Sequence, residues 1–200
     1  LWFEKAIRPK LRGEAYYVRF ADDFLILFQY ENEVKDVLEV LKRRLGKFML
    51  EVAEDKTRIL PIGRFKGTKD EFDFLGFTFF NAKTREGKYR LGIRTSKKKL
   101  KAKRQAAKAW LRTRMIRPIP ETMMRVAAII RGHCNYYGVN GNLRSLYKFH
   151  DYMKQMTHKM LNRRSQKGYV TNEKFQRVWD YYVAPPKLTK DIWQWIPKTV

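Results

Sequence analysis

The stretch Phe20-Ala21-Asp22-Asp23-Phe24-Leu25-Ile26-Leu27-Phe28 places two adjacent carboxylates inside an apolar run. Before it, apolar side chains recur at every second position over residues 16–20, which is the period of a strand. Residues 24–28 are apolar throughout and rich in strand formers, which is typical of a strand buried on both faces. The pattern predicts a β-hairpin with Asp22 and Asp23 at its tip.

These two aspartates are candidate metal ligands. Burying two like charges beside a hydrophobic sheet costs several kcal/mol unless a cation compensates them. Mg²⁺ binds carboxylate oxygens and substrate phosphates together. In two-metal nucleotidyl transfer, such ions activate the attacking 3′-hydroxyl and stabilise the leaving pyrophosphate. An adjacent pair of aspartates is also common in ordinary hairpin turns, so the dipeptide alone leaves both interpretations open.

Composition indicates a globular chain with a packed core, since 44% of the residues are hydrophobic and 14% are aromatic. Cys134 is the one cysteine, which excludes an internal disulfide and favours a reducing, cytoplasmic setting. The three histidines lack the spacing of zinc ligands, and the neighbouring pair His133 and Cys134 fits packing or RNA contact better than metal binding. No apolar stretch reaches the roughly twenty residues of a membrane span, so we expect no membrane partner.

Positive charge is concentrated in the second half of the chain. Residues 81–200 hold 29 of the 44 Lys and Arg but only 6 of the 20 Asp and Glu, and the net charge of the whole chain is +24. Residues 1–80 are nearly neutral. A folded, aromatic-rich segment with this asymmetry favours a nucleic acid as partner, because a merely solvated surface usually mixes both signs.

Periodicity in the first half predicts one helix and several further strands. Apolar residues follow helical spacing over residues 33–48, and this helix should cover one face of the sheet. Strands are expected at 58–62, 74–80 and 88–93, with a turn at 84–87 before the last of them.

The second half reads as helical. A basic helix is expected over residues 97–117, capped by Thr95 or Ser96 and ended by Pro118 and Pro120. Like charges at this density oppose helix formation unless an anion is present, and nucleic-acid phosphates would supply it. Further helices are expected over residues 121–137, 142–165 and 172–183, with a short aromatic tail at 192–197.

Several segments resemble blocks of one known family. Residues 20–23 (FADD) closely resemble the Tyr-Ala-Asp-Asp motif of reverse transcriptases, with Phe20 in the Tyr position. Residues 50–57 (LEVAEDKT) resemble the next block of that family, and residues 72–79 (FDFLGFTF) resemble the Leu-Gly-Phe block after it. Residues 131–138 (RGHCNYYG) and 161–167 (LNRRSQK) resemble segments of the maturase-specific domain, domain X. Their order is most similar to the reverse transcriptase/maturase of bacterial group II introns, over nearly the whole chain.

The resemblance implies an α+β fold in which a partial reverse-transcriptase palm precedes a basic, all-α bundle. The palm part consists of the β-hairpin and strands with a covering helix, and the bundle comprises the thumb and domain X. The expected domains are residues 1–94 for the C-terminal part of the palm, 95–120 for the thumb helix and 121–200 for the maturase-specific helical domain.

The resemblance also implies roles for particular residues. Asp22 and Asp23 would be catalytic and hold Mg²⁺ in a two-ion site, and Lys56 would be catalytic near the phosphates of the incoming nucleotide, although an ordinary surface lysine is the alternative. The residues expected near the primer or nucleotide are Phe20, Ala21, Leu75, Gly76 and Phe77. Nucleic-acid contacts are expected from basic and aromatic side chains, several of which, Tyr136 especially, have the core as an alternative: Lys97, Lys98, Lys99, Lys101, Lys103, Arg104, Lys108, Arg112, Arg114, Arg117, Arg131, Tyr136, Tyr137, Arg163, Arg164 and Lys167.

The implied function is an RNA-directed DNA polymerase, a nucleotidyltransferase, combined with a maturase that assists RNA splicing and copies the intron, a mobile element, into DNA. Its partners would be group II intron RNA and an RNA template with a DNA primer. The family uses a further aspartate on an earlier palm strand, and that block is absent from this chain. We therefore expect the chain to be a fragment with an incomplete site and no polymerase activity alone. Two alternatives remain: an RNA-binding splicing factor with a decayed polymerase, and a related host reverse transcriptase in phage defence.

Overall fold

The computed structural model describes residues 2–64, 69–113, 116–164 and 168–192. The chain divides into two compact units, residues 1–71 and residues 72–200. The first unit contains a β-hairpin and one long helix, and the second contains a three-stranded sheet followed by helices. The mixed α+β class predicted from the sequence is confirmed.

The first unit is built on the predicted hairpin. Strands β1 (Ala15–Phe20) and β2 (Asp23–Phe28) are antiparallel, and Phe20 pairs with Asp23 at the tip. Helix α1 (Glu31–Gly46) covers one face of the hairpin, as expected, through Val37. Val37 packs in a small core with a residue of β1 and two residues of a helical turn over Phe3–Ile7. This core holds the hairpin to the rest of the unit.

Two expectations for the first unit were wrong. Residues 24–28 are not buried on both faces, because the covering helix lies on one face alone. On the other face, the side chains of Tyr16, Val18, Phe20 and Leu27 are 44–64% exposed. Residues 58–62 form no strand, since their backbone pairs with no other strand and includes Pro61, which has no N–H to donate.

The second unit begins with a sheet in the order β3-β4-β5, comprising β3 (Glu71–Phe74), β4 (Phe77–Lys83) and β5 (Tyr89–Thr95). The strand expected over 74–80 is interrupted, because Leu75 and Gly76 form a tight turn between β3 and β4. Both turn residues have positive φ, 50° and 79°. The strand expected over 88–93 is β5, and the chain turns before it between Thr84 and Lys88 as predicted.

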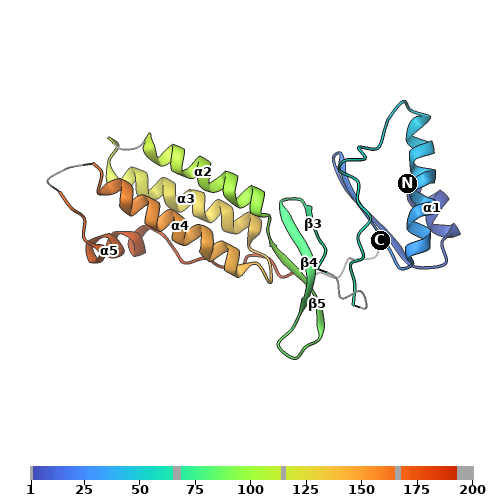
Figure 1. The fold of residues 1–200 in the computed structure, drawn as a ribbon. Coiled ribbons are helices and arrows are strands. Elements are labelled where there is room, and N and C mark those ends of the chain that lie inside the picture. Colours follow the sequence, from blue (N-terminus) through green and yellow to red (C-terminus); the bar gives the residue numbers. More distant parts are fainter. Residues whose placement is uncertain (1, 65–68, 114–115, 165–167, 193–200) are drawn as a thin grey trace. The chain divides into compact units, whose positions relative to one another are not determined.

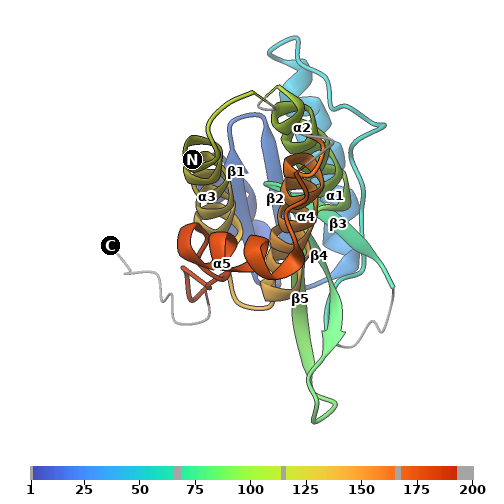
Figure 2. The same cartoon turned by 90° about the vertical axis from the view of Figure 1, so that its left-hand side faces the viewer.

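Four helices follow the sheet: α2 (Lys97–Arg112), α3 (Ile119–Tyr137), α4 (Leu143–Leu161) and α5 (Asn172–Tyr182). Helices α2, α3 and α4 lie side by side with the sheet at one end (Figure 1). Helices α2 and α4 run away from the sheet and α3 returns toward it, and Figure 2 looks along the resulting bundle. All four predicted helices are present.

The basic helix α2 ends earlier than expected, at Arg112 instead of residue 117. The hydroxyl of Thr113 donates a hydrogen bond to the carbonyl oxygen of Trp110 at 2.7 Å, and the Thr113 N–H also bonds backward, which closes the helix. The prolines expected to end α2 instead begin α3: Pro118 is its N-cap and Pro120 lies in its first turn. A proline is tolerated there because the first helical N–H groups have no intrahelical partner.

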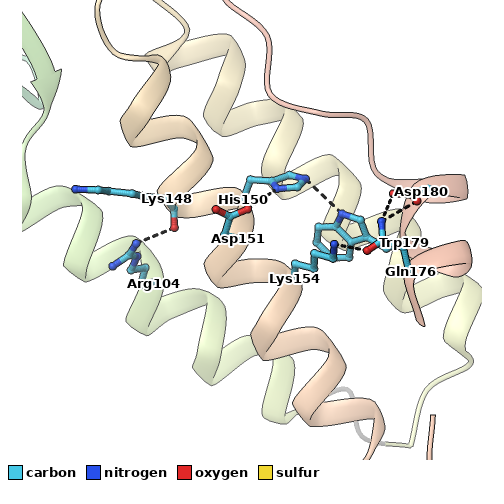
Figure 3. A network of polar contacts seen from close by, with 8 residues as sticks. All are labelled: Arg104, Lys148, His150, Asp151, Lys154, Gln176, Trp179 and Asp180. Carbon is cyan, nitrogen blue, oxygen red and sulfur yellow. Dashed lines mark hydrogen bonds and ion pairs between the residues drawn. The ribbon is translucent and has the colours of Figure 1, made fainter. Parts of the chain in front are cut away.

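Apolar residues of α4 form the centre of the bundle core. Leu146, Phe149, Met153 and Met160 are at most 6% exposed, and Trp179 of α5 packs against the same core. Polar contacts tie the helices together at the surface (Figure 3). The indole N–H of Trp179 donates to Nε2 of His150 at 3.3 Å, so α5 is anchored to α4 by both packing and a hydrogen bond.

Candidate metal-binding hairpin and nucleic-acid interface

The hairpin tip is a two-residue turn made of Ala21 and Asp22, while Asp23 begins β2. A two-residue hairpin turn requires positive φ, and Ala21 adopts φ 52° although glycine, asparagine or aspartate is usual there. The guanidinium Nε of Arg19 donates to the carbonyl oxygen of Ala21 at 2.8 Å and supports this backbone. The turn therefore presents two carboxylates from a backbone held in an uncommon conformation.

Asp22 and Asp23 are both exposed at this tip. Across the described ranges, no group of three or more His, Cys, Asp or Glu side chains is placed to hold a metal ion. Mg²⁺, however, is commonly held by one or two carboxylates together with substrate phosphates and water. The donor set fits part of a Mg²⁺ site, and the remaining ligands would come from outside this chain.

Lys56 lies in a separate turn of the first unit. The backbone N–H groups of Lys56 and Thr57 both donate to the carbonyl oxygen of Ala53, at 3.0 Å, and the Lys56 side chain is exposed. Within the described residues, no hydrogen bond or ion pair joins Lys56 to Asp22 or Asp23. Its proposed part in catalysis stays a prediction.

The second unit brings together two segments that lie far apart in the sequence. The hydroxyl of Tyr136 in α3 donates to the carbonyl oxygen of Leu75 at 3.0 Å. The ring of Phe77 stacks on that of Tyr136, with centroids 6.0 Å apart and planes 13° apart, and meets the edge of Tyr137. A Cβ on Gly76 would lie 2.8 Å from the Tyr137 hydroxyl oxygen. The turn expected near the primer is thus seated on α3, and glycine is required by both space and φ.

Two polar side chains that the sequence analysis did not single out fix this arrangement. Asp73 of β3 accepts hydrogen bonds from the hydroxyls of Thr78 and Ser96, the latter at 2.8 Å, so the first residues of α2 are tied to the β3–β4 turn. Asn142 is fully buried. Its amide accepts from the Thr95 N–H at 2.8 Å and donates to the Tyr137 carbonyl at 2.8 Å, which joins β5 to the end of α3.

A signal for each was present in the sequence. Asp73 is an acid within the apolar run of residues 72–80, and Asn142 stands at the start of a long apolar-periodic helix, where asparagine is a common cap. Their hydrogen-bond partners Ser96 and Thr95 lie 23 and 47 residues away in the sequence, and local sequence patterns do not indicate such distant pairs.

Most of the predicted nucleic-acid contacts on the basic helix are exposed. Five lysines and an arginine of α2 point to solvent, and Arg117, Arg131 and Arg163 elsewhere in the second unit are exposed as well. The exposed α2 residues are Lys97, Lys98, Lys99, Lys101, Lys108 and Arg112. Arg114 and Lys167 lie outside the described residues. The exposed cations leave a strongly positive surface available on the bundle.

Other members of the predicted set face the bundle. Arg104 donates to the carbonyl oxygen of Lys148 at 2.7 Å (Figure 3). Its guanidinium also lies over the Tyr152 ring. Lys103 is half-buried over the Phe149 ring, and burial lowers its pKa. The guanidinium of Arg164 donates to the carbonyl oxygen of Arg117 at 2.7 Å, at the start of α3. These cations stabilise helix packing.

Of the two predicted tyrosines, Tyr136 is 51% exposed and Tyr137 only 9% exposed. Core burial was considered from the sequence above all for Tyr136, but it is Tyr137 whose ring fills the space between β4 and α3. Tyr136 keeps an exposed edge beside the Leu75–Gly76 turn, so it remains available to a ligand there.

His133 is a packing residue. Its ring is 1% exposed and lies 4.8 Å from the ring of Tyr137 and 4.3 Å from that of Phe149, measured between centroids. Neither ring nitrogen has a hydrogen-bond partner in the described part of the chain. Burial, with a smaller contribution from the positive charge of Lys103, lowers the pKa of His133 to about 3. The imidazole is therefore neutral near pH 7.

Comparison with known protein families gives a match that includes the hairpin. The model of the family described as reverse transcriptase (RNA-dependent DNA polymerase) matches residues 2–79. The match includes Asp22, Asp23 and Lys56 and ends within β4. No curated protein matches the chain. Among the described residues, no helix is long and apolar enough to cross a membrane.

Proposed function

We propose that this chain is the C-terminal part of the palm, the thumb and the maturase-specific domain of a group II intron reverse transcriptase. The observation that carries the proposal is the pair Asp22 and Asp23 at the tip of a tight hairpin inside the residues that match the reverse-transcriptase model. A basic helical bundle with an aromatic-lined turn at one end supports a nucleic-acid partner.

In this proposal the chain supplies part of a nucleotidyl-transfer site. Asp22 and Asp23 would hold Mg²⁺, which supplies electrostatic stabilisation of the phosphates in transfer. Lys56 would place a positive charge, or a proton, at the leaving pyrophosphate. The Leu75–Gly76 turn, which Tyr136 fixes through a hydrogen bond, would support the primer terminus together with the exposed edge of the Tyr136 ring.

The exposed lysines in the first turns of α2 (Lys97, Lys98, Lys99 and Lys101) would contact phosphates of an RNA template paired with a DNA primer, because backbone contacts position a duplex without reading its sequence. The same bundle would bind group II intron RNA for splicing. A further catalytic aspartate from an earlier strand completes the site in this proposal, and the chain alone should extend no primer.

Metal binding is tested on the chain as it is, with Mn²⁺ as the probe and water-proton relaxation as the measurement. The variant carries Asp22→Asn and Asp23→Asn, and we expect it to lose the bound-Mn²⁺ signal. The control, Asp36→Asn with Glu51→Gln, makes the same change in charge at exposed positions elsewhere in the first unit. Equal signals from variant and control would overturn the metal assignment.

The nucleic-acid partner is tested by binding to a structured group II intron RNA, a single-stranded RNA of equal length and a duplex DNA across a salt series. The proposal predicts tight preference for the intron RNA that persists as salt rises. Equal affinity for all three that falls steeply with salt would show only nonspecific attraction to a polycation and would contradict the maturase assignment.

A further inference from the structure

Four cations meet at the end of the bundle that lies away from the sheet. Lys108 and Arg112 stand one turn apart on α2, while Lys159 stands on the last turn of α4 and Arg163 just beyond it. All four are exposed, and all four line one small depression between the two helices. We call this set the distal cation cluster.

The floor of the depression is apolar. Leu111 and Met160 are buried at 1% and 6% exposure, and Met156 is partly buried beside them. The space is only about 30 Å³, which is too small for a nucleobase. Recognition at this place therefore rests on the charged rim, with the apolar floor able to contact the edge of a ribose.

Among the residues that the structure describes, the rim carries no compensating carboxylate. No ion pair joins any of the four cations to an acid within the described part of the chain, and no acid lines the depression. Like charges one helical turn apart destabilise a helix unless an anion lies between them. The bundle core holds the two helices in contact regardless, so the cluster is a fixed concentration of positive charge.

We propose that the distal cation cluster is a phosphodiester-binding subsite for single-stranded RNA, separate from the aromatic-lined turn at the sheet end. Helix α2 rises about 1.5 Å per residue, which puts Lys108 and Arg112 on the order of 20 Å from the Leu75–Gly76 turn. A strand held at both places must extend along the bundle. This inference rests on the proposed nucleic-acid binding of the second unit and deepens it by naming the residues of a second point of contact.

The test compares two double variants of the full chain with the same loss of charge. Lys159→Gln with Arg163→Gln removes half of the cluster without touching its apolar floor. Lys174→Gln with Arg177→Gln is the control, because both side chains are exposed on α5 and neither lines the depression. Binding of a fluorescent single-stranded RNA is measured across a potassium chloride series. The slope of log K against log salt should fall by about 1.4 for the cluster variant, since each phosphate contact on a single strand contributes about 0.7.

A second measurement uses the unmodified protein, so it does not depend on the folding of a variant. Lysines are acetylated in the presence of the RNA, of inorganic phosphate at the same phosphate concentration, or of neither, and are then quantified by mass spectrometry. We expect the RNA to protect Lys108 and Lys159 more than Lys174.

Equal slopes for the two variants, or equal protection of the three lysines, would overturn the subsite while the RNA binding of the chain stood. Protection by inorganic phosphate alone would assign the cluster to a free anion and also overturn it. Absence of binding to the single-stranded RNA would likewise overturn the subsite, whereas absence of binding to the structured intron RNA as well would contradict the proposed function itself, so the two failures are distinguishable.

Discussion

The two units of this chain hold their functional residues in different ways. Among the described residues of the first unit, 1–71, a core of four buried apolar residues supports one face of a two-stranded hairpin, whose other face is exposed. In the described part of residues 72–200, fifteen buried residues join four helices, and the sheet is fastened to them by side chains of α3 and by Asn142. The proposed metal ligands therefore stand on a lightly supported element, and the proposed nucleic-acid contacts stand on a rigid one.

The two units also differ in net charge. Residues 72–200 carry 29 of the 44 Lys and Arg and only 7 of the 20 Asp and Glu. A large core tolerates this repulsion because burial of apolar surface contributes far more stability than exposed charges remove. We therefore expect the second unit to unfold cooperatively as one body. The first unit should unfold separately and with a smaller free energy of unfolding. Three substitutions test this, in order of decreasing effect.

The largest effect is expected at Asn142, which joins the sheet to the bundle. Asn142→Ala leaves the Thr95 N–H buried without a partner and removes the hydrogen bonds that the amide donates to the Thr95 hydroxyl and the Tyr137 carbonyl, so the free energy of unfolding should fall by about 3 kcal/mol. Urea unfolding followed by circular dichroism measures this. Asn135→Ala, an exposed position on α3, is the matched control and should change little.

Hydrogen exchange of the β4 and β5 peptides sharpens that test. If sheet and bundle are one unit, these strands lose protection together with the helices in the Asn142 variant. Loss of protection in the strands alone, at unchanged bundle stability, would show that the sheet is not part of the bundle's cooperative unit.

An intermediate effect is expected at His133, which should make the free energy of unfolding depend on pH. Because the pKa of His133 is lowered in the folded chain to about 3, the unfolded chain binds the proton more readily. The stability that follows from neutral His133 is complete above its unfolded pKa of about 6.5 and is lost as pH falls toward 3. From pH 7 to pH 5 the wild-type chain should lose about 2 kcal/mol more than His133→Phe, whose ring has no charge to bury.

Thermal or urea unfolding of both proteins at several pH values isolates the His133 contribution, since other titrating groups are shared. Parallel curves for the two proteins would mean that His133 is solvated in the folded chain, and the packing of the bundle around Phe149 would need revision.

The smallest effect is expected at Ala21, in the lightly supported unit. A left-handed conformation costs a non-glycine residue roughly 1–2 kcal/mol, and glycine adds about 0.4–1 kcal/mol of unfolded-state entropy. Ala21→Gly should therefore stabilise the first unit by about 0.5 kcal/mol. The exposed helical change Ala102→Gly, by contrast, should destabilise the second unit by about 1 kcal/mol. If Ala21→Gly instead destabilised the first unit, the inference that Ala21 is strained in the hairpin turn would be wrong.

Local patterns in the sequence predicted most of the helices and strands. Alternation marked the β1–β2 hairpin, and the period of apolar residues marked α1 and the four helices of the bundle, because each element must bury one face. Composition gave the charge asymmetry directly. The hairpin with Asp22 and Asp23 at its tip was predicted because two strand-like apolar runs flank a short polar turn.

Tertiary structure decided what each side chain faces. Sequence spacing did not separate Arg104 and Arg164, whose guanidinium groups donate to backbone carbonyl oxygens, from Lys108 and Arg163, which line the distal cation cluster. It did not show that the Leu75–Gly76 turn splits a strand and is seated on α3, or that Asn142 spans 47 residues to reach Thr95. The physical reason is that propensity and periodicity act over a few residues, whereas burial and hydrogen-bond partners depend on which faces of distant elements come into contact.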